Sequence, residues 1–516
     1  MGDTTDPKSL LTVAADEDDW PEVVRVLEAH WSTLISDHPV VVRDVVEGLP
    51  PAVLETYPRW AMARDYLQRI VPRPGEQLTR FRGTASPPRP VGFLDQLAQL
   101  TSRGASARAA GDLDAATESV TKARELLDAA SQATRDEMLS ALPEVQFEWG
   151  MVWEYAGDFD KAIREYVDSF DEALRDQNGM ARMVAAGALA WIHALCGRNL
   201  QARHWLDKLP EAGGEWWNGR SAVPAIFART LLLIDSLHFE DARAELAKAS
   251  LAVSPERWPF QKLLTALVTT DPTAAMSILA QIDGSASKVP AAVTENGPIG
   301  QYVAIARSIL FRVAGQPSDA ARALPQPSAR PVSVAEKLVA SLNASQLIRA
   351  SNDAAAGRIL AIARADLGTP RISVAALALT AVTQLRDGDR DAAAATFASA
   401  VSLADERALF HPLTVVPRTE LLQLLEESTT TLDPEVAGRL VAIAIDGSKD
   451  PFVSLTRKER QVLTLIVAGT RIQDVATELF VSVNTVKSQL ASIYRKTGTN
   501  SRDDLTRLAL TTGTLD

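Results

Sequence analysis

The chain has 516 residues, a single cysteine (Cys196) and a formal net charge of −12. This length is too great for one compact core, so several domains or an extended repeat array are expected. One cysteine excludes an internal disulfide framework. The start lacks a signal-peptide pattern and the chain lacks an uncharged apolar run of about 18 residues, so we expect a cytoplasmic protein that does not span a membrane.

A recurring turn phrase divides residues 1–427, which otherwise carry helical apolar patterns. It consists of a small residue, Gly, a polar residue and, five positions after the Gly, Ala. Gly can end one helix in a left-handed conformation, a following Asp can cap the next, and Ala lets the two helices approach closely. The first four copies lie 40 to 46 residues apart, and Gly315 and Gly388 are 73 residues apart, about two units, which predicts an all-α solenoid of stacked, tetratricopeptide-like helix pairs. The phrase occurs at Gly111, Gly157, Gly197, Gly315 and Gly388, with a glycine-free copy at Leu237.

Ten tryptophans lie between Trp20 and Trp258. Two of them, Trp216 and Trp217 in a Gly-rich loop, are candidates for a ligand or peptide groove, because rigid aromatic side chains anchor binding. Filling of the core is an equally good explanation for this pair and the better one for the other tryptophans. The six histidines show no metal-ligand spacing, and no nucleophile, base and metal-ligand set is visible. We therefore expect no metal, no cofactor, no catalytic residue and no enzymatic activity.

Residues 428–453 form a join between the array and the C-terminal segment. Asp433 can cap a short helix that has Pro434 at its first position and runs to Ile445. The apolar side of this helix can pack on the array or on a partner chain, and packing on the array is favoured. Residues 447–451 then predict a flexible hinge.

The last segment, residues 454–516, contains four short amphipathic stretches, each with its own helix-start signal. A turn of three or four residues separates the second stretch from the third, which is typical of a helix-turn-helix unit. The start signals are the capping boxes Thr456–Glu459 and Thr470–Gln473 and the caps Ser482 and Ser501.

The third stretch has one apolar and one polar face. Val486, Leu490 and Ile493 define the apolar stripe. Short polar side chains and a lysine on the other face can reach base edges, and the capped helix start can hold a phosphate. Residues 451–516 also carry nine basic and six acidic groups, a net +3, while the preceding 450 residues carry −15. The candidate DNA-binding residues are Ser482, Asn484, Thr485, Lys487, Ser488, Gln489, Arg495 and Lys496.

This segment resembles the DNA-binding domain of LuxR/FixJ-type transcription regulators. The family pattern is matched, in order, by Leu455, Thr456, Arg457, Glu459, Val462, Leu463, Gly469, Ala476, Leu479, Ser482, Thr485, Val486, Lys487, Ile493, Lys496, Gly498 and Arg502. The sequence departs from it at Ile472, where Asn is usual, at Gln489, where His is usual, and at Thr497 and Thr499. With Ala491 also non-basic, we expect base contacts near Lys487.

The array is similar to the repeat region of MalT-like regulators in the same group, through GLPPAVLETYPRWAMARDYL (48–67) and the run 406–427. The ATP-hydrolysing module of such relatives is not expected, because no GxxxxGK[ST] motif occurs. The resemblance implies a one-component regulator that binds promoter DNA as a homodimer and senses an unknown small molecule, peptide or protein through its repeats. The alternative is a protein–protein scaffold or adaptor with a degenerate helix-turn-helix.

Overall fold

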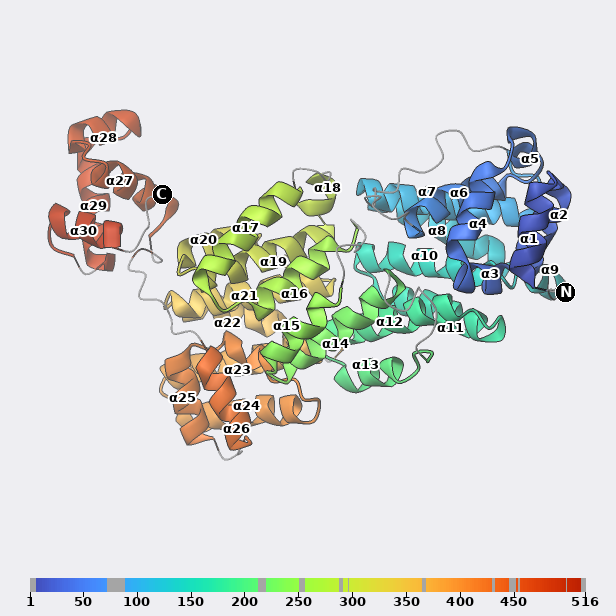
Figure 1. Cartoon of the computed structure of the whole chain (residues 1–516). Coiled ribbons are helices and arrows are strands. Elements are labelled where there is room, and N and C mark those ends of the chain that lie inside the picture. The colour runs from blue at the N-terminus through green and yellow to red at the C-terminus, as the bar shows by residue number, and fades with distance from the viewer. Residues whose placement is uncertain are drawn as a thin grey trace.

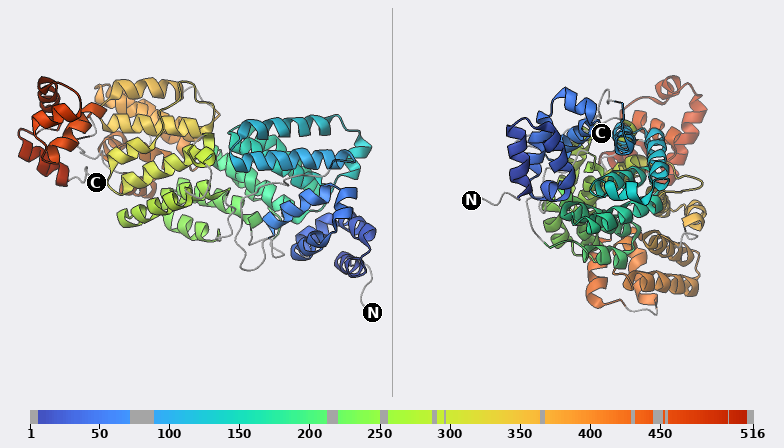
Figure 2. Two further views of the ribbon diagram at one scale, coloured as in Figure 1. Left: turned by 90° about the horizontal axis from the view of Figure 1, so that it is seen from above. Right: turned by 90° about the vertical axis from the view of Figure 1, so that its right-hand side faces the viewer.

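The computed structural model describes residues 6–71, 89–211, 220–249, 256–286, 291–295, 297–363, 368–428, 432–444, 452, 455–497 and 499–511. Every regular element in these ranges is a helix, which confirms the all-α prediction. In Figure 1 the helices follow one another across the molecule, from α1 at one end to α27–α30 at the other. The left view of Figure 2 separates the same two ends.

The first six helices form a unit with its own core, in which Leu11, Val23, Leu27 and Leu34 are fully buried. Pro at the first or second helical position or an Asp cap opens several of these short helices. The helices are α1 (Pro7–Asp16), α2 (Trp20–Ala29), α3 (Trp31–Asp37), α4 (Pro39–Gly48), α5 (Pro51–Thr56) and α6 (Arg59–Ile70).

The helices that follow form the array, in which many consecutive helices pack as antiparallel neighbours, as Figure 1 shows. In the first half these are α7 (Phe93–Ala110), α8 (Leu113–Asp128), α9 (Gln132–Glu137), α10 (Leu142–Ala156), α11 (Phe159–Arg175), α12 (Gly179–Cys196), α13 (Asn199–Leu206), α14 (Val223–Asp235) and α15 (Phe239–Ala247). In the second half they are α16 (Trp258–Val268), α17 (Pro272–Ala286), α18 (Ala291–Thr294), α19 (Gly297–Val313), α20 (Pro317–Ala323), α21 (Val334–Arg349), α22 (Asp353–Ala363), α23 (Pro370–Arg386) and α24 (Arg390–Asp405). The 3₁₀ turn η3 (His411–Val415) and α25 (Arg418–Glu427) complete the array.

The predicted turn phrase occurs where two paired helices meet. Gly157 has a φ of 79° and closes α10, and the adjacent Asp158 accepts a hydrogen bond from the Lys161 amide to cap α11. The glycine-free copy takes the same conformation, with φ 61° at Leu237. The Asp cap is absent where the chain has another residue, as at Arg198 before α13. The backbone turn is therefore common to the copies, whereas the side-chain cap is not.

Helices far apart in sequence also meet, so the array folds back on itself. Helix α12 contacts α23. The Arg371 guanidinium, at the start of α23, donates to both carboxylate oxygens of Asp235 at 2.7 Å and to the carbonyls of Ala194 and Leu195 at 2.8 and 3.0 Å. At Gly197 an added Cβ would lie 2.6 Å from the Arg371 amide nitrogen, so only Gly fits this approach.

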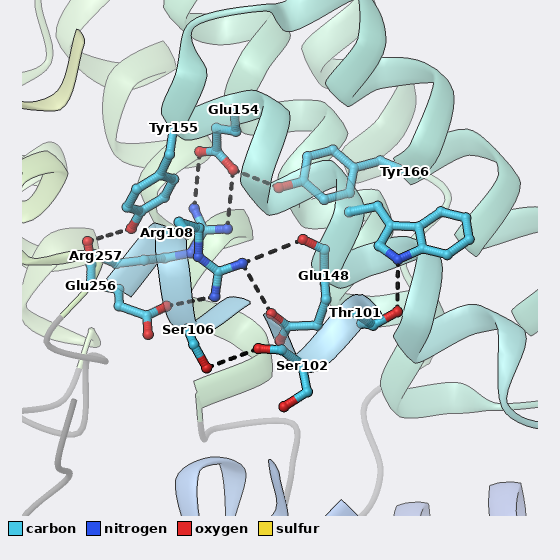
Figure 3. Close-up of polar contacts among 11 residues, drawn as sticks. Thr101, Ser102, Ser106, Arg108, Glu148, Glu154, Tyr155, Tyr166, Glu256 and Arg257 are labelled. Carbon is cyan, nitrogen blue, oxygen red and sulfur yellow. Dashed lines mark hydrogen bonds and ion pairs between the residues drawn. The ribbon is translucent and has the colours of Figure 1, made fainter. Parts of the chain in front are cut away.

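A buried polar network joins α7, α10, α11 and the residues before α16 (Figure 3). The fully buried Arg108 side chain donates to Glu148 at 3.0 Å and to Glu256 at 2.9 Å. Arg257 pairs with Glu154 at 3.2 Å, and the Tyr166 hydroxyl donates to the same carboxylate at 2.6 Å. Because these charged and polar groups are removed from water, each requires another as its partner. The network therefore fixes how the helices that carry them are aligned.

The tryptophans of α10 and α12 fill the core of the array, as predicted. Trp149 and Trp191 are fully buried, and the Trp149 indole N–H donates to the Thr101 hydroxyl at 2.8 Å. Among the residues that the structure describes, one helix, α12, is long and apolar enough to cross a membrane by composition, but 83% of it is buried inside the fold, as expected of a central core helix. Trp216 and Trp217 lie outside the described residues.

The join contains α26 (Pro434–Ile443), which Asp433 caps by accepting from the amides of Glu435 and Val436. The helix ends two residues before the predicted Ile445. It packs against η3 and α25, with Leu440 fully buried, so the prediction that it lies on the array is confirmed. The predicted hinge, residues 447–451, lies outside the described residues.

Candidate nucleic-acid interface

The C-terminal domain has its own small core, and it stands apart from the array in Figure 1. Its helices are α27 (Arg457–Val467), α28 (Ile472–Glu478), α29 (Val483–Thr497) and α30 (Arg502–Thr511). The core side chains come from all four helices and from two residues that precede them: Phe452, Leu455, Val462, Leu463, Ile466, Val475, Ala476, Val486, Leu490, Ile493, Leu505 and Ala509.

Three of the four predicted helix starts are confirmed. Thr456 and Glu459 form a reciprocal capping box, with hydrogen bonds of 3.3 and 2.7 Å. The Ser482 hydroxyl accepts from the Thr485 amide at 3.1 Å, and the Ser501 hydroxyl accepts from the Asp504 amide at 3.1 Å. Each of these contacts spans three residues, so the local sequence is enough to specify it.

The predicted Thr470–Gln473 capping box is wrong. The α28 helix begins one residue later, with Arg471 at its N-cap and no side-chain cap. Thr470 belongs to the end of α27 instead, because its amide donates to the Leu465 carbonyl at 3.0 Å after the left-handed Gly469. The turn at the end of the first helix therefore determines where the second begins.

Four residues, Leu479 to Ser482, separate α28 from α29. Within this turn Phe480 has a positive φ of 54° and a side chain that is 96% exposed. The short turn positions α28 and α29 in contact, with Val475 and Ala476 from one helix and Val486 and Leu490 from the other in the shared core. This is the arrangement of a helix-turn-helix unit.

The polar face of α29 is exposed along its length, opposite the buried Val486, Leu490 and Ile493. We call its exposed residues the α29 face: Asn484, Lys487, Ser488, Ala491 and Arg495. Thr485 is also exposed at the first turn, and Gln489 is partly buried at the edge of the face. The structure thus brings the sequence-predicted residues together at one surface, beginning at the helix end that Ser482 caps.

Lys496 is placed differently from the other predicted residues. Its ammonium group donates to both carboxylate oxygens of Glu459, on α27, at 2.7 and 3.0 Å. The Ser492 hydroxyl donates to the same carboxylate at 2.7 Å. Burial by itself would raise the pKa of Glu459, but hydrogen bonds from Lys496, Thr456 and Ser492 outweigh it and hold the pKa at about 2. Lys496 therefore fixes α29 against α27.

Arg502 has a related role that the sequence did not reveal. Its guanidinium donates to the carbonyls of Ile466 and Thr470 at 2.7 and 3.1 Å, at the C-terminal end of α27. A cation at this end also complements the helix dipole. The nine basic groups of the segment thus divide between internal contacts, as at Lys496 and Arg502, and exposed positions, as at Lys487, Arg495 and Arg471.

Comparison with known proteins supports this description of the domain. Residues 453–509 match the luxR family of bacterial regulatory proteins. The chain is 36% identical over 109 residues to the transcriptional regulatory protein YdfI of Bacillus subtilis, covering 21% of this chain and 47% of that protein. It is 35% identical over 82 residues to the oxygen regulatory protein NreC of Staphylococcus epidermidis, covering 16% of this chain and 38% of that protein. The chain spans less than half the length of either relative, and the C-terminal domain is a luxR-type helix-turn-helix.

Proposed function

We propose that this protein is a cytoplasmic transcription regulator that binds duplex DNA through the α29 face. The observation that carries the proposal is the first turn of α29, where the exposed Asn484, Thr485, Lys487 and Ser488 surround a helix N-terminus. An α-helix fits the major groove, and lysine and amide side chains there can bind base edges. Free amides at a helix start favour a phosphate.

Within this proposal the polar and basic residues of the domain have separate roles. Lys487 and Asn484 bind bases, Ser482 and Thr485 position a phosphate, and Gln489 and Arg495 extend the contact along the helix. Lys496 holds the helix in place through Glu459. Two copies of the chain bind adjacent half-sites as a homodimer, because one domain with a net +3 supplies little non-specific affinity. The helical array senses an effector and controls this binding.

The test begins with selection of sequences from a random duplex library by the full-length protein. Binding to the selected duplex is then measured by fluorescence anisotropy at several salt concentrations. Lys487→Ala is expected to weaken the selected duplex about 10-fold or more and to reduce discrimination against a scrambled duplex, because a good base contact contributes about 1–3 kcal/mol of discrimination.

Arg507→Ala is the charge-matched control. Arg507 lies on α30 and pairs with Asp504 at 2.6 Å, away from the α29 face. This variant is expected to bind within about threefold of the wild type, because it loses the same charge without losing a base contact. Absence of binding to any duplex at low salt would contradict the proposal and favour the scaffold or adaptor function.

A further inference from the structure

A large cavity lies within the array and reaches the join. It has a volume of about 550 Å³, within the range of small-molecule sites. Its walls come from α16, α19, α21, α23 and η3, and on one side from Ala442, Ile443 and Ala444 at the end of α26. The helix that precedes the DNA-binding domain therefore forms part of the cavity wall.

The lining is mainly apolar, but three arginines contribute to it: Arg312, Arg349 and Arg371. None of the described lining residues is Asp or Glu. By contrast, a smaller cavity of about 210 Å³, near α6 and α7, has four glutamates in its wall. In a chain with a net charge of −12, this concentration of cations in an apolar cavity calls for a specific explanation.

The three arginines differ in what they bind. Arg371 is neutralised by the buried Asp235 at 2.7 Å. Arg349 donates to the Val415 carbonyl at 3.3 Å. Arg312, in the last turn of α19, is half-buried and has no hydrogen-bond or ion-pair partner among the residues that the structure describes. Its partial burial in this apolar wall lowers its pKa. A guanidinium in an apolar environment without an acidic partner is costly unless an anion compensates it.

The imidazole of His411, which lies in the same wall as these arginines, adds no positive charge to the cavity. Burial, together with Arg371 and Arg312, lowers the pKa of His411 to about 3, so the ring is neutral at pH 7. A neutral imidazole can donate a hydrogen bond from one nitrogen and accept one at the other. The Thr414 hydroxyl is a further donor in the wall, whereas the Ser341 hydroxyl already donates to the Lys337 carbonyl at 3.0 Å. The polar groups of the cavity are thus suited to an acceptor-rich, negatively charged group.

We infer that this cavity binds an amphipathic anion, a molecule with an apolar body and a carboxylate or phosphate group, with Arg312 as its charge partner. The apolar body contacts side chains such as Leu263, Ile305 and Leu342. Binding of the anion stabilises the packing of α26 against the array, because Ala442 and Ile443 form part of the same cavity wall. The link from α26 to DNA binding rests on the proposed function, whereas binding of the anion does not.

Binding is tested by calorimetry on the full chain with four probes that each contain ten carbon atoms: decanoate, decyl phosphate, decan-1-ol and decylamine. The anions are expected to bind at least about 10-fold more tightly than the alcohol, because a charged hydrogen-bond partner contributes more than a neutral one. A preference for one anion identifies the head group as carboxylate or phosphate. Equal binding of alcohol and anions, or a preference for the amine, would overturn the inference.

Arg312→Gln is expected to weaken binding of the preferred anion about 10- to 100-fold and to leave binding of decan-1-ol unchanged. Arg312→Lys keeps the positive charge, and its affinity for the anion is expected to stay within about 10-fold of the wild type. Retained binding in this variant shows that the loss in Arg312→Gln comes from the missing charge and not from misfolding. Arg307→Gln is the matched control, because Arg307 lies on the same helix, pairs with Asp283 at 2.6 Å and is not part of the cavity wall. Wild-type affinity in Arg312→Gln would refute the assignment.

Hydrogen exchange then shows which helices are stabilised when the anion binds. Binding of the preferred anion is expected to slow exchange in α26 and to leave α8, which is remote from the cavity, unchanged. Protection elsewhere without protection in α26 would contradict the proposed site. None of these measurements involves DNA, and Lys487→Ala is expected to bind the anion normally, so this inference and the proposed function can fail separately.

Discussion

Glu459 offers the sharpest test of how the DNA-binding domain is held together. Its carboxylate is 6% exposed and accepts from Thr456, Ser492 and Lys496 at 2.7 Å each. Glu459→Gln removes the charge that these donors stabilise while keeping the size of the side chain. We expect the variant to lose stability in the C-terminal domain and to leave the array unaffected.

The magnitude follows from the pKa of Glu459. Its folded value of about 2 lies below the ordinary value of 4.5. At about 1.36 kcal/mol per pKa unit, the ionised carboxyl contributes about 3 kcal/mol to the free energy of unfolding. Because the folded pKa is the lower one, this contribution is complete at neutral pH and is lost as the pH falls from about 4.5 toward 2. Linkage predicts a loss from this group of about 0.8 kcal/mol at pH 4 and about 2 kcal/mol at pH 3.

The assay is hydrogen exchange of peptides from α27 and α29, because every tryptophan lies before residue 259 and fluorescence reports only on the array. Glu478→Gln, at an exposed position on α28, is the control and is expected to change protection little. A difference between Glu459→Gln and wild type below about 1 kcal/mol at pH 7 would refute the reasoning. So would a difference that fails to shrink as the pH falls.

Two further predictions concern the array and are measured by tryptophan fluorescence during urea unfolding. Arg108→Ala is expected to cost about 3–5 kcal/mol, because it removes a buried cation that pairs with both the Glu148 and the Glu256 carboxylates; a cost below about 1 kcal/mol would show that the network tolerates the loss. Gly157→Ala is expected to destabilise more than Gly388→Ala. Both glycines have positive φ, but an added Cβ at Gly157 meets the Ser333 side chain at 2.8 Å, whereas at Gly388 nothing lies within 4 Å. Equal losses would mean that backbone strain alone sets the cost.

Much of the C-terminal domain could be predicted because its signals are local. The Thr456–Glu459 box and the Ser482 and Ser501 caps depend on residues three positions apart. The apolar stripe through Val486 and Ile493 follows from helical periodicity. The Thr470–Gln473 box failed because the end of the preceding helix uses the Thr470 amide. The end of one helix and the start of the next can use the same backbone amide, and a short sequence motif does not show which of the two will use it.

In the array, too, local features could be predicted from the sequence and long-range contacts could not. Its turn phrase predicted the left-handed conformation at Gly111, Gly157 and even Leu237. The sequence could not show that α23 returns to α12, where Arg371 meets Asp235 across 136 positions. Ion pairs of this kind form only after the helices have packed, and no spacing rule relates their positions along the chain.

The sequence by itself determined the all-α character of the chain, several helix caps, the luxR-type character of the last segment and the face of α29 that is polar. Only the tertiary structure decided which of the charged residues are free to contact a ligand. It paired Lys496 with Glu459 and placed Arg312 in a cavity wall without an acidic partner among the described residues. The physical reason is range: caps and periodicity act within about four residues, whereas burial and pairing of charges depend on which helices finally meet.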